Sequence, residues 1–130
     1  MKREEIREQT MQLIFQMDAQ GEFDYEKLIP IAENTKIITK ERALKTLTAI
    51  RDHIEEIDNA IKSNLDNWKF DRIAKTDLAI LRNAVAEIMY NEDLPNGISI
   101  NEAVNMAKKY GDEKSYAFVN SVLSKINSSL

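Results

Sequence analysis

The sequence predicts an all-α protein, a compact bundle of about six or seven helices in two packed halves. Apolar residues recur at the three- and four-residue spacing of helices along nearly the whole chain, and no segment alternates like a strand. The three glycines and two prolines fall between these periodic segments. We therefore expect a single domain over residues 1–130, with helical halves at 1–66 and 67–130.

The N-terminal half is expected to hold two well-separated helical stretches. The first helix is predicted over residues 3–20, and its apolar face comprises Ile6, Thr10, Leu13, Ile14 and Met17, widened by Met11 and Phe15. Asp24 is the predicted cap of a short second helix, which Pro30 either kinks or restarts. Thr39 is the predicted cap of a stretch over 40–66, as one helix or two. Its narrow seam consists of Leu47, Ile50, Ile54, Ile57 and Ile61.

Three further helices are expected in the C-terminal half. One is predicted over 71–90, with a buried stripe of Ile73, Ile80, Leu81, Ala84 and Ile88. Ser99 and Glu102 have the spacing of a capping box, which predicts the start of the next helix. Gly111 suits the left-handed position that ends that helix, and Asp112 is the predicted cap of the last one.

Composition excludes several classes of function. The chain has no cysteine, which removes disulfides, thiol catalysis and cysteine metal sites. No apolar run approaches the ~18–20 residues of a membrane span, and the charged N-terminus predicts no secretion, so we expect a cytoplasmic protein without a membrane partner. The net charge of −4 argues against nonspecific coating of nucleic acid but leaves room for a local basic patch.

Catalysis is not expected. The single histidine, His53, lies among acidic residues of a long helix, where a solvated helix face is the simplest interpretation. The sequence contains no glycine-rich phosphate loop and no G-x-S-x-G motif. Neighbouring acidic pairs on a helix do not face each other and make poor chelates. We therefore predict no catalytic residue, no metal site and no cofactor.

Two basic groupings favour binding instead. Lys2, Arg3 and Arg7 open the first helix, and positions 3 and 7 share one face. The second grouping surrounds Gly111 and consists of Lys108, Lys109, Tyr110, Lys114 and Tyr116. Lysines neutralise phosphates and tyrosines stack on unpaired bases, which indicates RNA binding. The same residues also suit a helix end and a packed aromatic.

Two alternatives stay open at this point. Ala107 and Gly111 have the spacing of a helix-turn-helix DNA reader, although Asn120 and Tyr116 fit that unit poorly. A helical scaffold that binds only protein is equally compatible with the composition.

The segment "ISINEAVNMAKKYGDEKSYAFVNSVL" resembles the "AINEAIELAKKFG…FVNGVL" signature of the NusB family of bacterial transcription antitermination factors. "DRIAKTDLAILRNAVAEI" is similar to the family's "LRIAxxEL" helix, and "KREEIREQTMQLIFQMD" to its basic opening helix. The resemblance covers most of the chain and is weakest across 22–66.

This resemblance implies an all-helical RNA-binding protein without catalytic activity or cofactor. Such proteins pair with NusE, a small-subunit ribosomal protein, hold the boxA sequence of nascent RNA, and join other Nus factors on RNA polymerase to suppress termination. The RNA-binding residues implied by position are Lys2, Arg3, Arg7, Lys109, Tyr110, Lys114 and Phe118. The implied partner-binding residues are Asp77 and Arg82.

Two signature positions have structural expectations, and two positions depart from the family pattern. Glu102 is expected to complete its cap, and Asn120 to tie adjacent helices by a buried hydrogen bond. The opening helix is poorer in arginine than the family's, which predicts weak RNA binding without the ribosomal partner. Ser121 replaces the glycine of "FVNGVL", which predicts a slight shift of the helix.

Overall fold

A computed structural model describes residues 2–29 and 35–130, and within them the protein has six α-helices and no strand. The helices are α1 (Arg3–Gln20), α2 (Tyr25–Leu28), α3 (Glu41–Lys62), α4 (Lys75–Tyr90), α5 (Asn96–Tyr110) and α6 (Ser115–Ser129). Short 3-10 helices at Thr35–Thr39 and Phe70–Arg72 precede α3 and α4. The predicted all-α class is confirmed. The division into halves near residue 67 stays a prediction.

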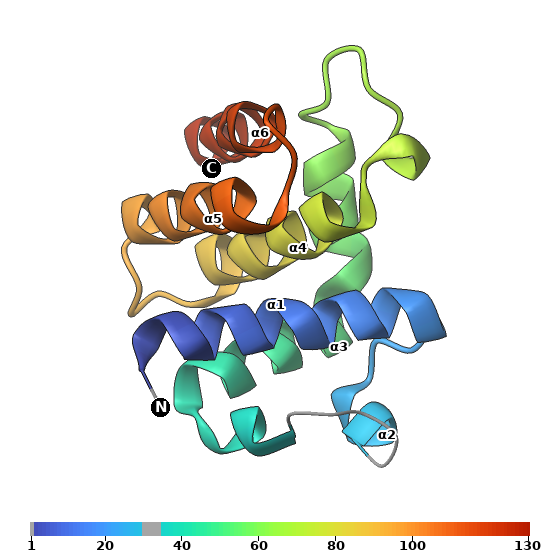
Figure 1. The fold of residues 1–130 in the computed structure, drawn as a ribbon, viewed down its shortest axis with the longest axis vertical. Coiled ribbons are helices and arrows are strands. Elements are labelled where there is room, and N and C mark those ends of the chain that lie inside the picture. Colours follow the sequence, from blue (N-terminus) through green and yellow to red (C-terminus); the bar gives the residue numbers. More distant parts are fainter. Residues whose placement is uncertain (1, 30–34) are drawn as a thin grey trace.

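Helix α4 lies at the centre of the bundle and packs against α1, α3, α5 and α6 (Figure 1). Every residue from 77 to 88 is buried, so this helix has no solvent face over that span. A helix surrounded on all sides belongs to the core of a domain. The predicted stripe of α4 is confirmed as buried, but it is one part of a helix that is buried all round.

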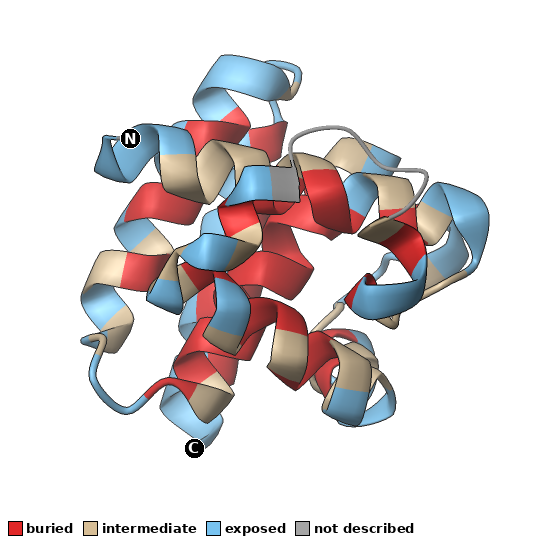
Figure 2. Ribbon diagram, turned by 90° about the horizontal axis from the view of Figure 1, so that it is seen from below, coloured by how far each residue is buried: buried red, intermediate tan, exposed pale blue. Residues whose placement is uncertain are grey.

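The apolar periodicity located most of the core correctly. In Figure 2 the buried residues lie on the inward faces of the helices. The seam of α3 is buried at Leu47, Ile50, Ile57 and Ile61. Helix α1 has the predicted bounds and a buried Met11, whereas Phe15 is 39% exposed and does not widen its face.

Helix α1 ends at a left-handed glycine. Gly21 has a φ of 66°, and its N–H donates to the carbonyl of Asp18, while the N–H of Glu22 donates to the carbonyl of Met17. This pattern satisfies carbonyl groups that the helix leaves free, and glycine adopts it without a steric penalty. Asp24 caps α2 as predicted, accepting from the N–H of Glu26. The expectation at Pro30 lies outside the described residues.

Two expectations about α3 and α4 need correction. Thr39 does not cap α3: Lys40 occupies the cap position, and the Thr39 hydroxyl donates to the carbonyl of Lys36. The stretch after it ends at Lys62 and is continuous, with a kink at His53, where φ is −134° and ψ is 26°. Helix α4 begins at Lys75 and not at residue 71, because a 3-10 turn occupies the intervening segment.

The predicted capping box of Ser99 and Glu102 does not form. Helix α5 begins at Asn96 after Pro95, so Ser99 lies within the helix and is buried. The carboxylate of Glu102 does not return to its own backbone but pairs with arginines from other helices. Tertiary ion pairing has overridden the local motif. Asn120 is exposed, so the expected buried hydrogen bond is also wrong.

The turn between α5 and α6 differs from the prediction in conformation. Gly111 has a φ of −93° and a ψ of −173°, which is extended and not left-handed. Glycine is required there for space, since a Cβ would lie 2.4 Å from the Cβ of Ser115 and 2.8 Å from the carbonyl oxygen of Ala107. Asp112 accepts from the N–H of Lys114, within the turn, and the cap position of α6 belongs to Lys114.

We expect Gly111→Ala to destabilise the protein by about 1–3 kcal/mol, because the added methyl group overpacks the turn. Gly97 provides the matched control: it lies in the first turn of α5, and a Cβ there meets nothing within 4 Å. Gly97→Ala should be neutral or stabilising by about 0.5–1 kcal/mol. Urea denaturation of both variants measures the difference, and equal stabilities would contradict the steric explanation.

Candidate nucleic-acid interface

Side-chain contacts link the helices that carry the two predicted basic groupings, although about a hundred positions separate them in the chain. The ammonium of Lys109 is 2.8 Å from one carboxylate oxygen of Glu8, and the hydroxyl of Tyr110 is 2.7 Å from the other. We call the surface formed by Lys2, Arg3, Arg7, Lys109 and Tyr110 the basic face. Its members come from the first turns of α1 and the last turn of α5, two helices that run in the same direction in Figure 1.

Several cations of the basic face are held in internal ion pairs. Arg3 and Lys109 keep 60% of their side chains exposed, whereas Arg7 keeps 12%. Arg3 and Arg7 both reach the carboxylate of Glu102, at 2.9 and 3.1 Å. The local positive charge is therefore reduced, and Lys2, Arg3 and Lys109 are the members that solvent reaches.

Glu8 and Tyr110 perturb each other through their hydrogen bond. Hydrogen bonding from Lys109 lowers the pKa of Glu8 despite its partial burial, and the Tyr110 hydroxyl adds to the effect. Donating to that carboxylate raises the pKa of Tyr110 in turn. Glu8 was missed by the sequence analysis because its partners lie 101 and 102 positions away, and nothing local marks it.

A buried ion network fixes the position of the basic face. It consists of Arg3, Arg7, Arg42, Glu87 and Glu102. Arg42 binds Glu87 through two nitrogens, at 2.6 and 3.1 Å, and Glu102 at 3.0 Å. Burial alone would raise the pKa of Glu102, but the hydrogen bonds from Arg42 and Arg7 outweigh it and hold the pKa below its ordinary value.

Three further predicted site residues, Asp77, Lys114 and Phe118, line a pocket beside the α5–α6 turn. This bend pocket, of about 220 Å³, is lined by residues that include Trp68, Arg72, Asp77, Lys114, Ser115 and Phe118. The rings of Trp68 and Phe118 are 5.6 Å apart, and Trp68 is 58% exposed. Trp68 was also missed, although a lone tryptophan in the polar stretch "DNWKFD" is a usable signal for a binding residue.

Asp77 occupies the floor of the bend pocket with an incomplete set of hydrogen bonds. One carboxylate oxygen accepts from the Ser115 hydroxyl at 3.1 Å, and the other is buried without a partner among the described residues. The side chain is only 7% exposed. Burial raises the pKa of Asp77, which the Ser115 hydrogen bond only partly opposes. A buried acceptor without a donor costs stability.

Arg82 lies inside the bundle, 4% exposed, and not on a partner-facing surface. Its guanidinium binds both oxygens of Asp58 at 2.9 Å and one oxygen of Asp18 at 3.0 Å. These bonds connect α4 to α3 and α1. Because it is buried, Arg82 is not part of an exposed contact surface. Its role is to hold α4 against α3 and α1.

No helix in the described part of the chain has the length and apolar character needed to cross a bilayer. Residues 2–29 and 35–130 also contain no group of three or more histidine, aspartate or glutamate side chains placed to hold a metal ion.

We expect Glu102→Gln to destabilise the protein by about 3 kcal/mol at neutral pH, because it leaves buried guanidinium groups without their carboxylate. Since the folded protein lowers the pKa of Glu102, this stabilisation is present above the unfolded pKa near 4.5 and is lost as the pH falls through the lower folded value. Urea denaturation at several pH values tests this. The exposed Glu55→Gln should change stability by less than about 0.5 kcal/mol, and an equal effect of the two variants would contradict the role of the network.

Comparison with known proteins provides an independent view of the chain. A family model described as the NusB family matches residues 4–128. The chain is 42% identical to a Transcription antitermination protein NusB of Bacillus mycoides over 130 residues, covering all of both chains. It is 40% identical to a protein of the same name from Clostridium botulinum, covering 97% of this chain and 99% of that one. A solved structure titled T. maritima NusB superposes with a TM-score of 0.83 at 30% identity, over 98% of this chain and 92% of that chain.

Proposed function

This chain belongs to the NusB family, and from that premise we propose that it is an RNA-binding transcription antitermination factor. Together with the ribosomal protein NusE it holds the boxA sequence of nascent RNA. With other Nus factors it acts on RNA polymerase in the bacterial cytoplasm and suppresses premature termination. It works by binding, without catalysis and without a cofactor.

The observation that supports the proposal is that ion pairs and hydrogen bonds link the helices carrying the two basic groupings. Lys2 and Arg3 at the start of α1 and Lys109 and Tyr110 at the end of α5 are exposed. Two side-chain links connect the helices that carry them: Arg3 with Glu102, and Glu8 with Lys109 and Tyr110. Exposed cations attract phosphates, and an exposed tyrosine ring offers a stacking surface for an unpaired base. This combination favours single-stranded RNA, whose bases are free to stack, over duplex DNA.

Internal ion pairing supports a dependence on the protein partner. Glu8 and Glu102 already neutralise part of the basic face, and the whole chain carries a net charge of −4. RNA binding by the isolated protein is then weak. A bound basic protein beside this face supplies the missing positive charge and extends the surface that the RNA contacts.

The bend pocket is the proposed contact surface for NusE. Trp68 and Phe118 supply aromatic area, and Asp77 supplies a buried acceptor that lacks a donor. Aromatic anchors around a polar group that becomes paired on binding are typical of the centre of a protein interface. Lys114, an exposed residue that lines the same pocket, adds a positive charge to this surface.

We expect Lys2→Ala combined with Lys109→Ala to weaken boxA binding several-fold and to flatten its salt dependence by roughly 0.7 logarithmic units for each lysine removed. The matched control is Lys27→Ala combined with Lys36→Ala, two exposed lysines outside the basic face. Gel-shift titrations with RNA alone, NusE alone and both together measure the effect.

The same titrations distinguish the proposal from its alternative. A scrambled RNA that binds as tightly as boxA would reduce the interaction to charge attraction. If NusE binds and RNA never enters the assembly, the protein is a scaffold for proteins only. Equal effects of the two lysine pairs would contradict the placement of RNA on the basic face.

Asp77→Asn should weaken NusE binding while stabilising the free protein by about 1 kcal/mol near neutral pH. Because folding raises the pKa of Asp77, its ionisation opposes folding above the unfolded value of 3.8, so the gain vanishes in acid. Thermal unfolding from pH 3 to pH 7 and a pull-down with NusE provide the two measurements. Asp71→Asn, at an exposed aspartate, should change neither, and a stabilised variant with intact NusE binding would remove Asp77 from the interface.

A further inference from the structure

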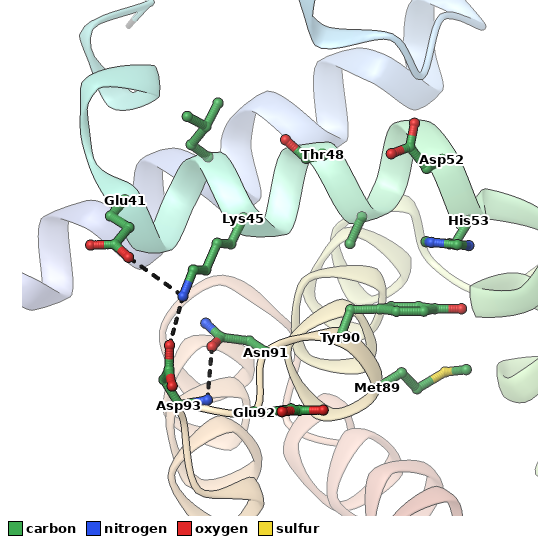
Figure 3. Close-up of a pocket in the computed structure, with 12 residues that line it drawn as sticks. Glu41, Lys45, Thr48, Asp52, His53, Met89, Tyr90, Asn91, Glu92 and Asp93 are labelled. Carbon is green, nitrogen blue, oxygen red and sulfur yellow. Dashed lines mark hydrogen bonds and ion pairs between the residues drawn. The ribbon is translucent and has the colours of Figure 1, made fainter.

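An open groove of about 660 Å³ lies between α3 and the C-terminal end of α4, on residues to which the proposed function gives no task (Figure 3). We call it the α3–α4 groove; its main lining residues are Lys45, Asp52, His53, Tyr90, Glu92 and Asp93. It shares no lining residue with the bend pocket and includes no member of the basic face.

The lining of the groove is strongly acidic. Glu41, Asp52, Glu92 and Asp93 face a single lysine, Lys45. The Lys45 ammonium is already held between Asp93 at 2.7 Å and Glu41 at 3.4 Å, as Figure 3 shows. Asp52 accepts from Arg51 at 2.9 Å, whereas Glu92 is exposed and makes no ion pair with any described residue. Negative charge therefore exceeds positive charge along the groove.

The end of α4 adds to this negative potential. The helix finishes at Tyr90 in the wall of the groove, and its last turn contains no basic residue. The free carbonyl groups of a helix C-terminus carry roughly half a negative charge and favour a cation within about one turn. Here the chain itself does not provide that cation from α4, so a ligand with positive charge is favoured at this end.

One wall of the groove is aromatic. The rings of His53 and Tyr90 stack with centroids 4.2 Å apart and an interplanar angle of 7° (Figure 3). The kink of α3 lies at His53, a member of this stack. Leu44, 37% exposed, and Met89 contribute apolar area nearby. A planar guanidinium stacks on such rings, and its aliphatic stem covers apolar side chains.

We propose that the α3–α4 groove docks a basic, arginine-containing segment of a partner protein. Arginine side chains from that segment contact Glu92 and the end of α4 and stack on the aromatic wall, while its apolar side chains cover Leu44. The charge of the groove excludes nucleic acid, because phosphates are repelled by the same carboxylates. The groove thus gives this protein a second docking surface, independent of the basic face and of the bend pocket.

The test uses the full chain and a capped peptide, Arg-Leu-Arg-Lys-Leu-Arg, in calorimetric and NMR titrations. His53 is the only histidine, so its Cε1–H proton gives a single NMR signal that reports directly on the groove. The peptide should shift that signal and bind with a measurable Kd, and a version with glutamate in place of the basic residues should do neither. A boxA-type RNA should leave the signal unchanged.

Matched variants separate the groove from general charge attraction. Glu92→Gln with Asp93→Asn should weaken peptide binding about fivefold, because it removes the exposed carboxylate that pairs with the peptide and lowers the negative charge of the groove. Glu5→Gln with Asp71→Asn removes equal charge elsewhere and should have little effect. Lys45→Ala removes the competing ammonium and should tighten binding. Equal weakening by both double variants, an unshifted His53 signal, or a shift caused by RNA would each overturn the proposal.

Discussion

The carboxylate of Glu102 remains inside this protein only because arginines from two other helices neutralise it, and much of the architecture depends on that constraint. Arg3 and Arg7 reach it from α1, and Arg42 reaches it from α3 while also binding Glu87 on α4. A buried charge without partners would cost several kcal/mol, so the four helices must approach in one arrangement. That arrangement brings the start of α1 beside α5 and creates the basic face.

Helix α4 also carries buried polar residues that must be paired. Its four buried polar residues find partners on three neighbouring helices: Asp77 on α6, Arg82 on α1 and α3, Asn83 on α1, and Glu87 on α3. Apolar packing would tolerate a helix shifted by one turn, whereas hydrogen-bonded buried pairs would not. The polar residues of the central helix therefore specify the register of the bundle, and the apolar residues supply the driving force.

The proposed binding surfaces share side chains with this framework, which limits how strongly each can act. Arg3 and Arg7 stabilise the fold through Glu102 and are thereby less available to phosphates. Asp77 differs from these arginines, since one of its oxygens is buried without a hydrogen-bond partner among residues 2–29 and 35–130. A position that costs stability and lies beside exposed aromatic residues is typical of a site completed by another molecule. The acidic α3–α4 groove lies outside this framework.

Local sequence determined the helices themselves. Apolar spacing gave the bounds of α1 and the buried seam of α3, because periodicity depends only on neighbours within a few turns. Tertiary structure decided what the polar residues do. Glu102 has the spacing of a local capping pattern, yet three arginines from other helices pair with it. Arg82 was expected to contact a partner protein, yet hydrogen bonds to α1 and α3 hold it inside the bundle. Gly111 was identified as a break, but the close approach of Ser115 set its conformation. The partners of such residues are remote in sequence, and their energies outweigh local preferences once water is excluded.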